Sequence, residues 1–121
     1  MHKSFLTFIF TVVMIGVFAS LAHGAMRESA YQNEWCGERE GQVEYVLQDR
    51  ARVDCLLPEY AVEVDFDNKW AEAIGQALYY AAMTGKKPAV LLIVGHNQER
   101  YLARFQRAAA GLGITLFLIE E

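Results

Sequence analysis

The chain has 121 residues, with 11 lysines and arginines against 15 aspartates and glutamates and a formal net charge of −4 at pH 7. An acidic chain gains little from general attraction to phosphate, so a wide electrostatic footprint on duplex nucleic acid is disfavoured. The length leaves room for one small domain after an N-terminal segment, with a single sheet and two or three helices.

Residues 1–25 have the pattern of a secretory signal peptide. A charged start is followed by an apolar run from Phe5 to Leu21 and by small residues around Gly24. The run is also just long enough to span a bilayer, so an uncleaved N-terminal membrane anchor is the alternative. We expect an exported protein, periplasmic or secreted, with residues 26–121 as a single domain and no stable membrane contact once the signal is cleaved.

Two cysteines, Cys36 and Cys55, follow this segment. In an exported protein such a pair is often a disulfide, which contributes about 3 kcal/mol for a loop of this size. Two buried thiols that pack as small hydrophobic groups are the alternative. The spacing of the cysteines disfavours a zinc site, because no CxxC pair or histidine pair accompanies them. We therefore predict a disulfide.

Three short strands follow a first helix. The polar segment 26–35 predicts a short helix that ends near Gly37. Alternating or apolar residues predict strands over 42–47, 52–57 and 60–66, separated by turns too short for a crossover. Strands spaced this closely can only form an antiparallel meander.

The second half of the chain alternates helices and strands. Asp67 and Asn68 are good caps for a helix that begins at Lys69 and ends at Gly85. The remaining elements are a buried strand over 89–94, a helix over 98–110 and a last strand over 114–119. We therefore predict an α/β domain with a mixed sheet, in which an antiparallel three-strand meander is followed by α-β-α-β and the helices pack on the sheet.

Three acidic residues stand in the second and third strands. Glu63 and Asp65 share one face of their strand, and Asp54 can lie beside them on the neighbouring strand. Carboxylates in apolar strands are costly to bury unless they are paired, hydrogen-bonded or bound to a metal. Three oxygen-bearing groups at one point suit a hard divalent cation, with Mg²⁺ as the default. The alternative is a solvated face on which Arg52 pairs with Glu63 or Asp65 across the strands.

Three segments carry a joint pattern around these acids. They are Val53-Asp54-Cys55-Leu56 on one strand, Val62-Glu63-Val64-Asp65 on the next, and Gln76-Ala77-Leu78-Tyr79-Tyr80 on the following helix. Their order resembles the PD-(D/E)xK nuclease superfamily, in particular its RecB-like branch, whose helix bears a Gln-x-x-x-Tyr motif. The resemblance covers residues 42–119 and implies a restriction-endonuclease-like fold.

The resemblance implies an exported nuclease that hydrolyses phosphodiester bonds in nucleic acid with Mg²⁺ or Mn²⁺. The residues assigned to the site are Asp54, Glu63 and Asp65 as metal ligands, and Gln76 and Tyr80 as groups that orient the site or the substrate. The family usually carries Lys where this chain has Asp65, and we expect Lys69 to assist the attacking water instead. The alternative is a catalytically inactive nuclease-fold protein that acts as a periplasmic or extracellular binding module.

Smaller features concern the C-terminal part of the chain. Arg100, Arg104 and Arg107 recur at i, i+4 and i+7 on one face of the last helix. Such a stripe is usually a solvated face, although in a nuclease it can hold a phosphate backbone. His96 follows a buried strand, and a structural or exposed role is favoured for it. A domain this small often needs to form a homodimer in order to grip duplex nucleic acid.

Overall fold

A computed structural model of the chain describes residues 27–96 and 99–121, so the predicted signal peptide lies outside the described residues. In chain order the elements are α2 (Glu28–Glu38), β1 (Gln42–Val46), β2 (Arg52–Leu56), β3 (Tyr60–Phe66), the 3₁₀ turn η1 (Asp67–Lys69), α3 (Trp70–Thr84), β4 (Lys87–Val94), α4 (Glu99–Ala109) and β5 (Thr115–Glu120). Among these described elements, no helix has both the length and the apolar composition needed to cross a membrane.

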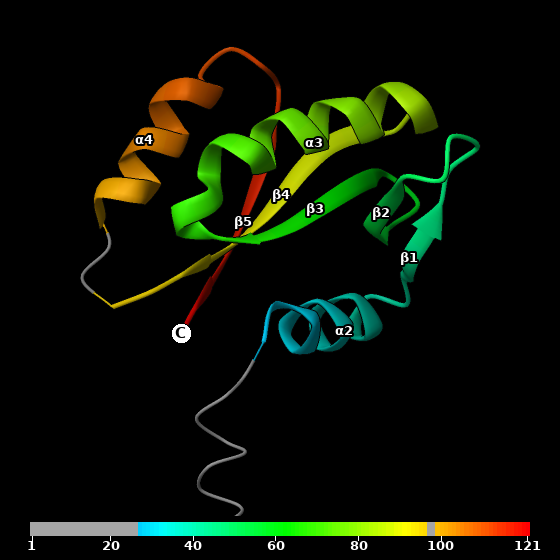
Figure 1. Ribbon diagram of the computed structural model, residues 1–121, viewed down its shortest axis with the longest axis horizontal. Coiled ribbons are helices and arrows are strands. Elements are labelled where there is room, and N and C mark those ends of the chain that lie inside the picture. The colour runs from blue at the N-terminus through cyan, green and yellow to red at the C-terminus, as the bar shows by residue number, and fades with distance from the viewer. Residues whose placement is uncertain (1–26, 97–98) are drawn as a thin grey trace, which may run out of the picture.

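The five strands form one mixed sheet in the order β1-β2-β3-β4-β5 (Figure 1). β1, β2 and β3 pair antiparallel as a meander, and β3, β4 and β5 pair in parallel. Each parallel pair is joined by a helix, α3 or α4, because a parallel connection needs a crossover. The predicted α/β class and the mixed sheet with helices packed on it are confirmed.

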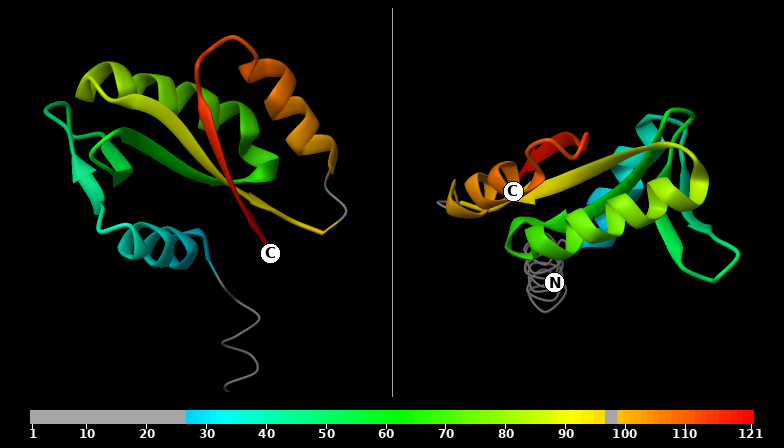
Figure 2. Two further views of the ribbon diagram at one scale, coloured as in Figure 1. Left: turned by 180° about the vertical axis from the view of Figure 1, so that it is seen from behind. Right: turned by 90° about the horizontal axis from the view of Figure 1, so that it is seen from above.

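The helices cover both faces of the sheet (Figure 2). On one face, α2 packs through Trp35 and Cys36 against a cluster that includes Val62 and Val64 of β3. On the other face, α3 and α4 pack against β4, and Phe105 of α4 is 2% exposed. β4 is therefore buried on both sides, which is why its sequence is a continuous apolar run.

The start of α3 differs from the prediction. Lys69 is the residue at the N-cap position, and no side chain caps the helix. Asp67 is instead buried in the 3₁₀ turn, where its Oδ2 accepts a hydrogen bond from the backbone N–H of Gly95 at 3.2 Å. The prediction that Asp67 and Asn68 cap the helix is wrong, because the Asp67 carboxylate is used to hold the chain that leaves β4.

Cys36 and Cys55 form a disulfide, with an Sγ–Sγ distance of 2.09 Å, as predicted. The bond ties α2 to β2 one residue after Asp54. Gly41, in the connection from α2 to β1, lies against it. A Cβ atom at Gly41 would stand 2.6 Å from the Cys36 Sγ and 2.8 Å from the Cys55 Sγ. The close approach requires glycine here, because both sulfur atoms belong to a covalent cross-link that has little room to shift.

We expect Gly41→Ala to lower the free energy of unfolding by about 1 to 3 kcal/mol, the usual cost of overpacking a closed site. Urea unfolding under oxidising conditions measures this change. Gly37→Ala is the matched control, because a Cβ at Gly37 meets nothing within 4 Å and alanine favours the helix. Equal stability of the two variants would contradict the packing argument.

Candidate functional site

Glu63 and Asp65 are carboxylates buried in a central strand. Glu63 is 4% exposed and Asp65 is 5% exposed, and both lie on the face of β3 opposite to Val62 and Val64. The ion pairs found among residues 27–96 and 99–121, which are Arg39–Glu38 and Lys87–Glu59, involve neither acid. The alternative of a solvated face with an Arg52 cross-strand pair is therefore wrong.

Asp54 lies where β2 and β3 part. The ladder between these strands consists of the pairs Cys55–Val62 and Leu56–Ala61, and it stops before Asp54 reaches Glu63. In place of a ladder bond, the Asp54 Oδ2 accepts the Val64 N–H at 2.8 Å. The side chain of Asp54 thus replaces a backbone acceptor and is held at the opening of the strands, next to Glu63.

Gln32 of α2 links Glu44 of β1 to the backbone of Asp54. It is 3% exposed, and its Nε2 donates to the Glu44 Oε1 at 3.0 Å and to the Asp54 backbone oxygen at 3.1 Å. Glu44 has a φ of 55°, a left-handed conformation that is uncommon for a residue with a side chain. Glu44 is exposed, and the hydrogen bond from Gln32 holds its carboxylate near Asp54, whose pKa its negative charge raises.

The three strand acids share an environment that favours their neutral forms. Burial raises the pKa of Asp54 to about 6 and that of Asp65 to about 7. Burial, reinforced by the negative charge of Asp54 and a hydrogen bond with it, raises the pKa of Glu63 to about 10. The Oε2 atom of Glu63 is buried without a hydrogen-bond partner. None of the ion pairs formed within residues 27–96 and 99–121 involves Glu63, so no such pair stabilises its ionised form.

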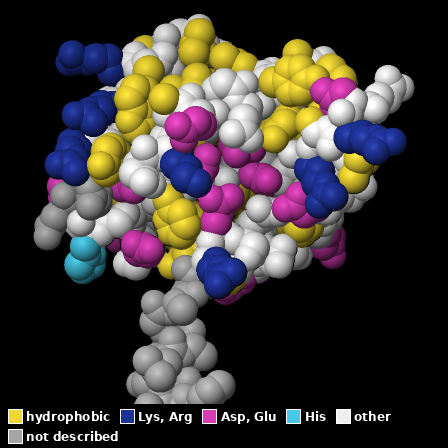
Figure 3. Space-filling model, viewed as in Figure 1, with side chains coloured by type: hydrophobic (Ala, Val, Ile, Leu, Met, Phe, Trp, Pro, Cys, Tyr) yellow, Lys and Arg dark blue, Asp and Glu magenta, His cyan; other side chains and the backbone are white. Residues whose placement is uncertain are grey.

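Glu28 is a further acid beside the strand acids that sequence reasoning did not find. After burial, its charge and a hydrogen bond with it are the next causes that raise the pKa of Asp65. An acid in the first turn of a helix is ordinarily explained by its favourable interaction with the helix dipole. The local sequence therefore does not indicate that Glu28 lies beside Asp65. Figure 3 shows the acidic side chains gathered on the middle of one face of the molecule.

Lys69, Gln76 and Tyr80 lie around the same acids. Lys69 is exposed, and its charge lowers the pKa of Asp65, against the larger effect of burial. The hydroxyl of Tyr80 donates to the Gln76 Oε1 at 3.1 Å. Burial, followed by the charges of Glu63 and Asp54, raises the pKa of Tyr80. The residues that the sequence grouped into one site are thus neighbours in the fold.

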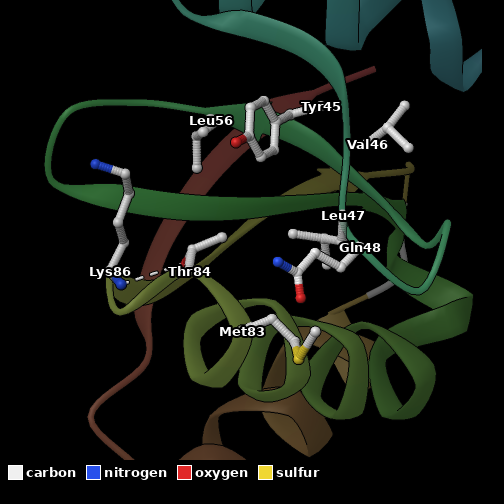
Figure 4. A pocket seen from close by; sticks show the side chains of 8 residues that line it. All are labelled: Tyr45, Val46, Leu47, Gln48, Leu56, Met83, Thr84 and Lys86. Atoms are coloured by element: carbon white, nitrogen blue, oxygen red, sulfur yellow. Dashed lines mark hydrogen bonds between the residues drawn. The ribbon is translucent and has the colours of Figure 1, made fainter.

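Other candidates lie away from the carboxylates. Arg100, Arg104 and Arg107 are exposed on α4, outside the acidic group. His96 is exposed after β4. A pocket of about 370 Å³ opens between the β1–β2 hairpin and the end of α3 (Figure 4), and none of its lining residues is acidic. This pocket is therefore separate from the carboxylate group.

The chemistry of the donors fits a hard divalent cation, although their present positions do not form a coordination shell. Within the described ranges, no three His, Cys, Asp or Glu side chains are arranged to hold a metal ion. The carboxylates nevertheless supply oxygen ligands, which Mg²⁺ and Mn²⁺ prefer, and the Glu63 Oε2 has no competing partner.

Comparison with protein-family models, with curated proteins and with solved structures found no match. The fold and the site define the molecule as a small α/β domain with a disulfide and a group of buried carboxylates at the opening between two strands.

Proposed function

We propose that this domain is a Mg²⁺- or Mn²⁺-dependent phosphodiesterase of the PD-(D/E)xK type that cleaves nucleic acid. One observation carries the proposal: the Glu63 Oε2 is buried without a partner beside the charges of Asp54 and Asp65. A carboxylate oxygen in such a place is costly unless a cation or a proton compensates it. A divalent cation would compensate all three acids at once.

The order of elements supports the finer fold assignment to the restriction-endonuclease-like class. Within residues 42–119, an antiparallel meander and an α-β-α-β continuation stand in the order that the resemblance implies. The acids fall on β2 and β3, and the Gln-x-x-x-Tyr segment falls on α3 beside them.

Each residue has a defined part in the proposed reaction. Asp54, Glu63 and Asp65 would hold the cation, which would supply Lewis-acid polarisation of a phosphodiester and a more acidic water. Lys69 would place its ammonium group near the attacking water or the developing negative charge. The Tyr80–Gln76 hydrogen bond would keep the Gln76 amide oriented at the rim of the site.

Hydrolysis of bis(p-nitrophenyl) phosphate tests the activity. We expect release of p-nitrophenol with Mn²⁺ or Mg²⁺, and a loss of about 100-fold or more in Lys69→Met, since one donor at a developing charge contributes a factor of about 10² to 10³. Lys87→Met is the matched control, because Lys87 is bound to Glu59 at 2.8 Å and lies outside the site. No hydrolysis by the unaltered protein with any divalent ion would refute the proposal.

A second candidate function is a binding module that keeps the fold without the chemistry. It is favoured by the absence of a ready coordination shell among residues 27–96 and 99–121 and by Asp65 at the position where the family usually has Lys. Calorimetric titration with Mn²⁺ separates the two candidates. A specific site with about one ion per chain supports the enzyme, and heats of dilution alone support the binding module.

We further propose that the protein is exported. The N-terminal pattern of residues 1–25 and the disulfide support this, because disulfides persist in oxidising compartments. The mass of the mature protein distinguishes a cleaved signal peptide from a retained membrane anchor.

A further inference from the structure

α4 presents three arginines to solvent on one side. At 100° per residue, Arg100, Arg104 and Arg107 fall within an arc of about 60°, roughly opposite the face that packs on the sheet through Leu102 and Phe105. All three are exposed. In the part of the chain that the structure describes, no carboxylate oxygen lies within 4 Å of their guanidinium groups. This arginine stripe therefore keeps its full charge available to a ligand.

The side chain of Tyr101 organises two of these arginines. The guanidinium carbon of Arg100 lies 4.7 Å from the centre of the Tyr101 ring, and that of Arg104 lies 5.8 Å from it. The Arg100 Nη2 also donates to the Tyr101 hydroxyl at 3.1 Å. Stacking on the ring limits the freedom of both guanidinium groups and leaves most of their N–H donors unused.

α4 is placed relative to the carboxylates by the turn that follows β3. α4 packs against α3 and against η1, the turn that holds Lys69. The Asp67 carboxylate in the same turn binds the Gly95 N–H, in the segment that leads from β4 to α4. In Figure 3 the basic side chains over α4 and the acidic group appear on the same face, with α4 at its edge.

We propose that the arginine stripe of α4 binds the sugar-phosphate backbone of a polynucleotide strand whose neighbouring phosphodiester enters the carboxylate site. The inference rests on the proposed function and names the substrate as a chain rather than a mononucleotide. The stripe spans seven residues, or about 10 Å along the helix. A stacked strand advances about 3.4 Å along its axis for each phosphate, as in a duplex, so the stripe spans up to about three phosphates.

A strand fits this surface better than a flat anionic membrane does. The acidic group in the middle of the same face repels a broad negative surface. A single strand can contact the stripe at the edge and reach the centre, where a bound cation would offset the acids. Arginine is suited to this task, because its planar group binds phosphate through two parallel donors.

Strand affinity and hydrolysis of a small diester, measured side by side, test the inference. The variant Arg100→Gln/Arg104→Gln/Arg107→Gln is compared with the unaltered protein by fluorescence anisotropy on a labelled 20-nucleotide strand, as DNA and as RNA, in Ca²⁺. We expect the dissociation constant to rise at least tenfold for DNA, RNA or both. The slope of log K against log salt should fall by about 2, at about 0.7 per phosphate contact on a single strand. Hydrolysis of bis(p-nitrophenyl) phosphate should change less than twofold.

The control variant Arg39→Gln/Lys86→Gln/Lys87→Gln removes the same charge elsewhere, and we expect it to retain strand affinity within twofold. Equal losses in both variants, or no loss in the α4 variant, would overturn the inference. Binding of the unaltered protein to phosphatidylserine vesicles but not to either strand would also overturn it. If the unaltered protein binds a strand through α4 but hydrolyses no diester, the proposed enzyme fails and the backbone site stands. Thermal unfolding of each variant verifies that the domain is folded.

Discussion

Glu63→Gln is expected to abolish the stabilisation of the domain by Mg²⁺ and Mn²⁺ and to lower diester hydrolysis at least about 10³-fold. Glutamine keeps the size of the side chain but removes the charge that an ion would neutralise. Loss of Lewis-acid stabilisation amounts to several kcal/mol of barrier, and each 1.36 kcal/mol is a factor of ten in rate. Thermal unfolding with and without 5 to 10 mM Mn²⁺, an ordinary working range, measures the first effect, and p-nitrophenol release measures the second.

Glu59→Gln is the control for this substitution, because Glu59 is an exposed acid in the turn before β3 that pairs with Lys87 at the start of β4. It should leave the response to Mn²⁺ unchanged. Without ions, Glu63→Gln should be about as stable as the unaltered protein at pH 7, since burial and the neighbouring charge of Asp54 keep Glu63 protonated there. An unaltered rise in melting temperature with Mn²⁺ in Glu63→Gln would show that the ion binds elsewhere.

The cation-free domain is expected to lose stability as the pH rises from about 4 to about 8. The pKa values of Asp54 and Asp65 are raised to about 6 and about 7, and that of Glu63 to about 10. The unfolded chain releases these protons near pH 4, while the folded chain holds them to higher pH. Stability is therefore fully present below about pH 4 and is lost as the pH rises through the folded-state pKa values.

The expected loss is of the order of several kcal/mol. A change of the Asp54 pKa from 3.8 to about 6 corresponds to about 3 kcal/mol, and Asp65, which is less shielded from solvent, contributes less than its pKa alone implies. Urea unfolding in EDTA at pH 5 and at pH 8 measures the difference. Asp65→Asn should flatten the dependence, and saturating Mn²⁺ should reverse part of it. Stability that rises between pH 5 and pH 8 would contradict the assigned directions.

These two predictions test different properties of one group of side chains. The ion response reports whether the acids bind a cation together, and the pH response reports whether they are buried without one. If both effects are observed, the carboxylates destabilise the domain without a cation and a bound cation stabilises it. A pH response without an ion response would favour the binding module.

Local patterns were sufficient to predict most of the fold. The alternation around Val62, Glu63 and Val64 specified which side chains of β3 share a face, because the period of a strand is two residues. The short turns required a meander, and the continuous apolar run of β4 predicted a strand buried on both faces. The bounds of β3 agree with the prediction, and the other boundaries differ by at most three residues, since helix and strand ends are set by contacts beyond the local sequence.

The sequence misjudged residues whose roles depend on distant partners. Asp67 is of a residue type that favours helix N-caps. Its carboxylate instead accepts a hydrogen bond from the backbone N–H of Gly95, 28 residues further along the chain. Nothing in the segments that contain Glu44 and Glu28 links them to the strand acids. Glu44 is exposed, and Gln32 holds it near Asp54, while Glu28 comes near Asp65 because α2 packs beside β3.

The sequence by itself determined the α/β class, the cysteine pair and the order of Asp54, Glu63, Asp65 and the helix that carries Tyr80, because each follows from periodicity, spacing or residue type. Tertiary structure decided that Glu63 and Asp65 are buried rather than solvated. The physical reason is that burial and charge repulsion act through space: β2 and β3 part at Asp54, and α2 and α3 close over the opening. Acids alternate with apolar residues in the same way on a solvent-exposed face and on a buried face of a sheet. Only the packing of other elements over that face determines whether the acids are buried.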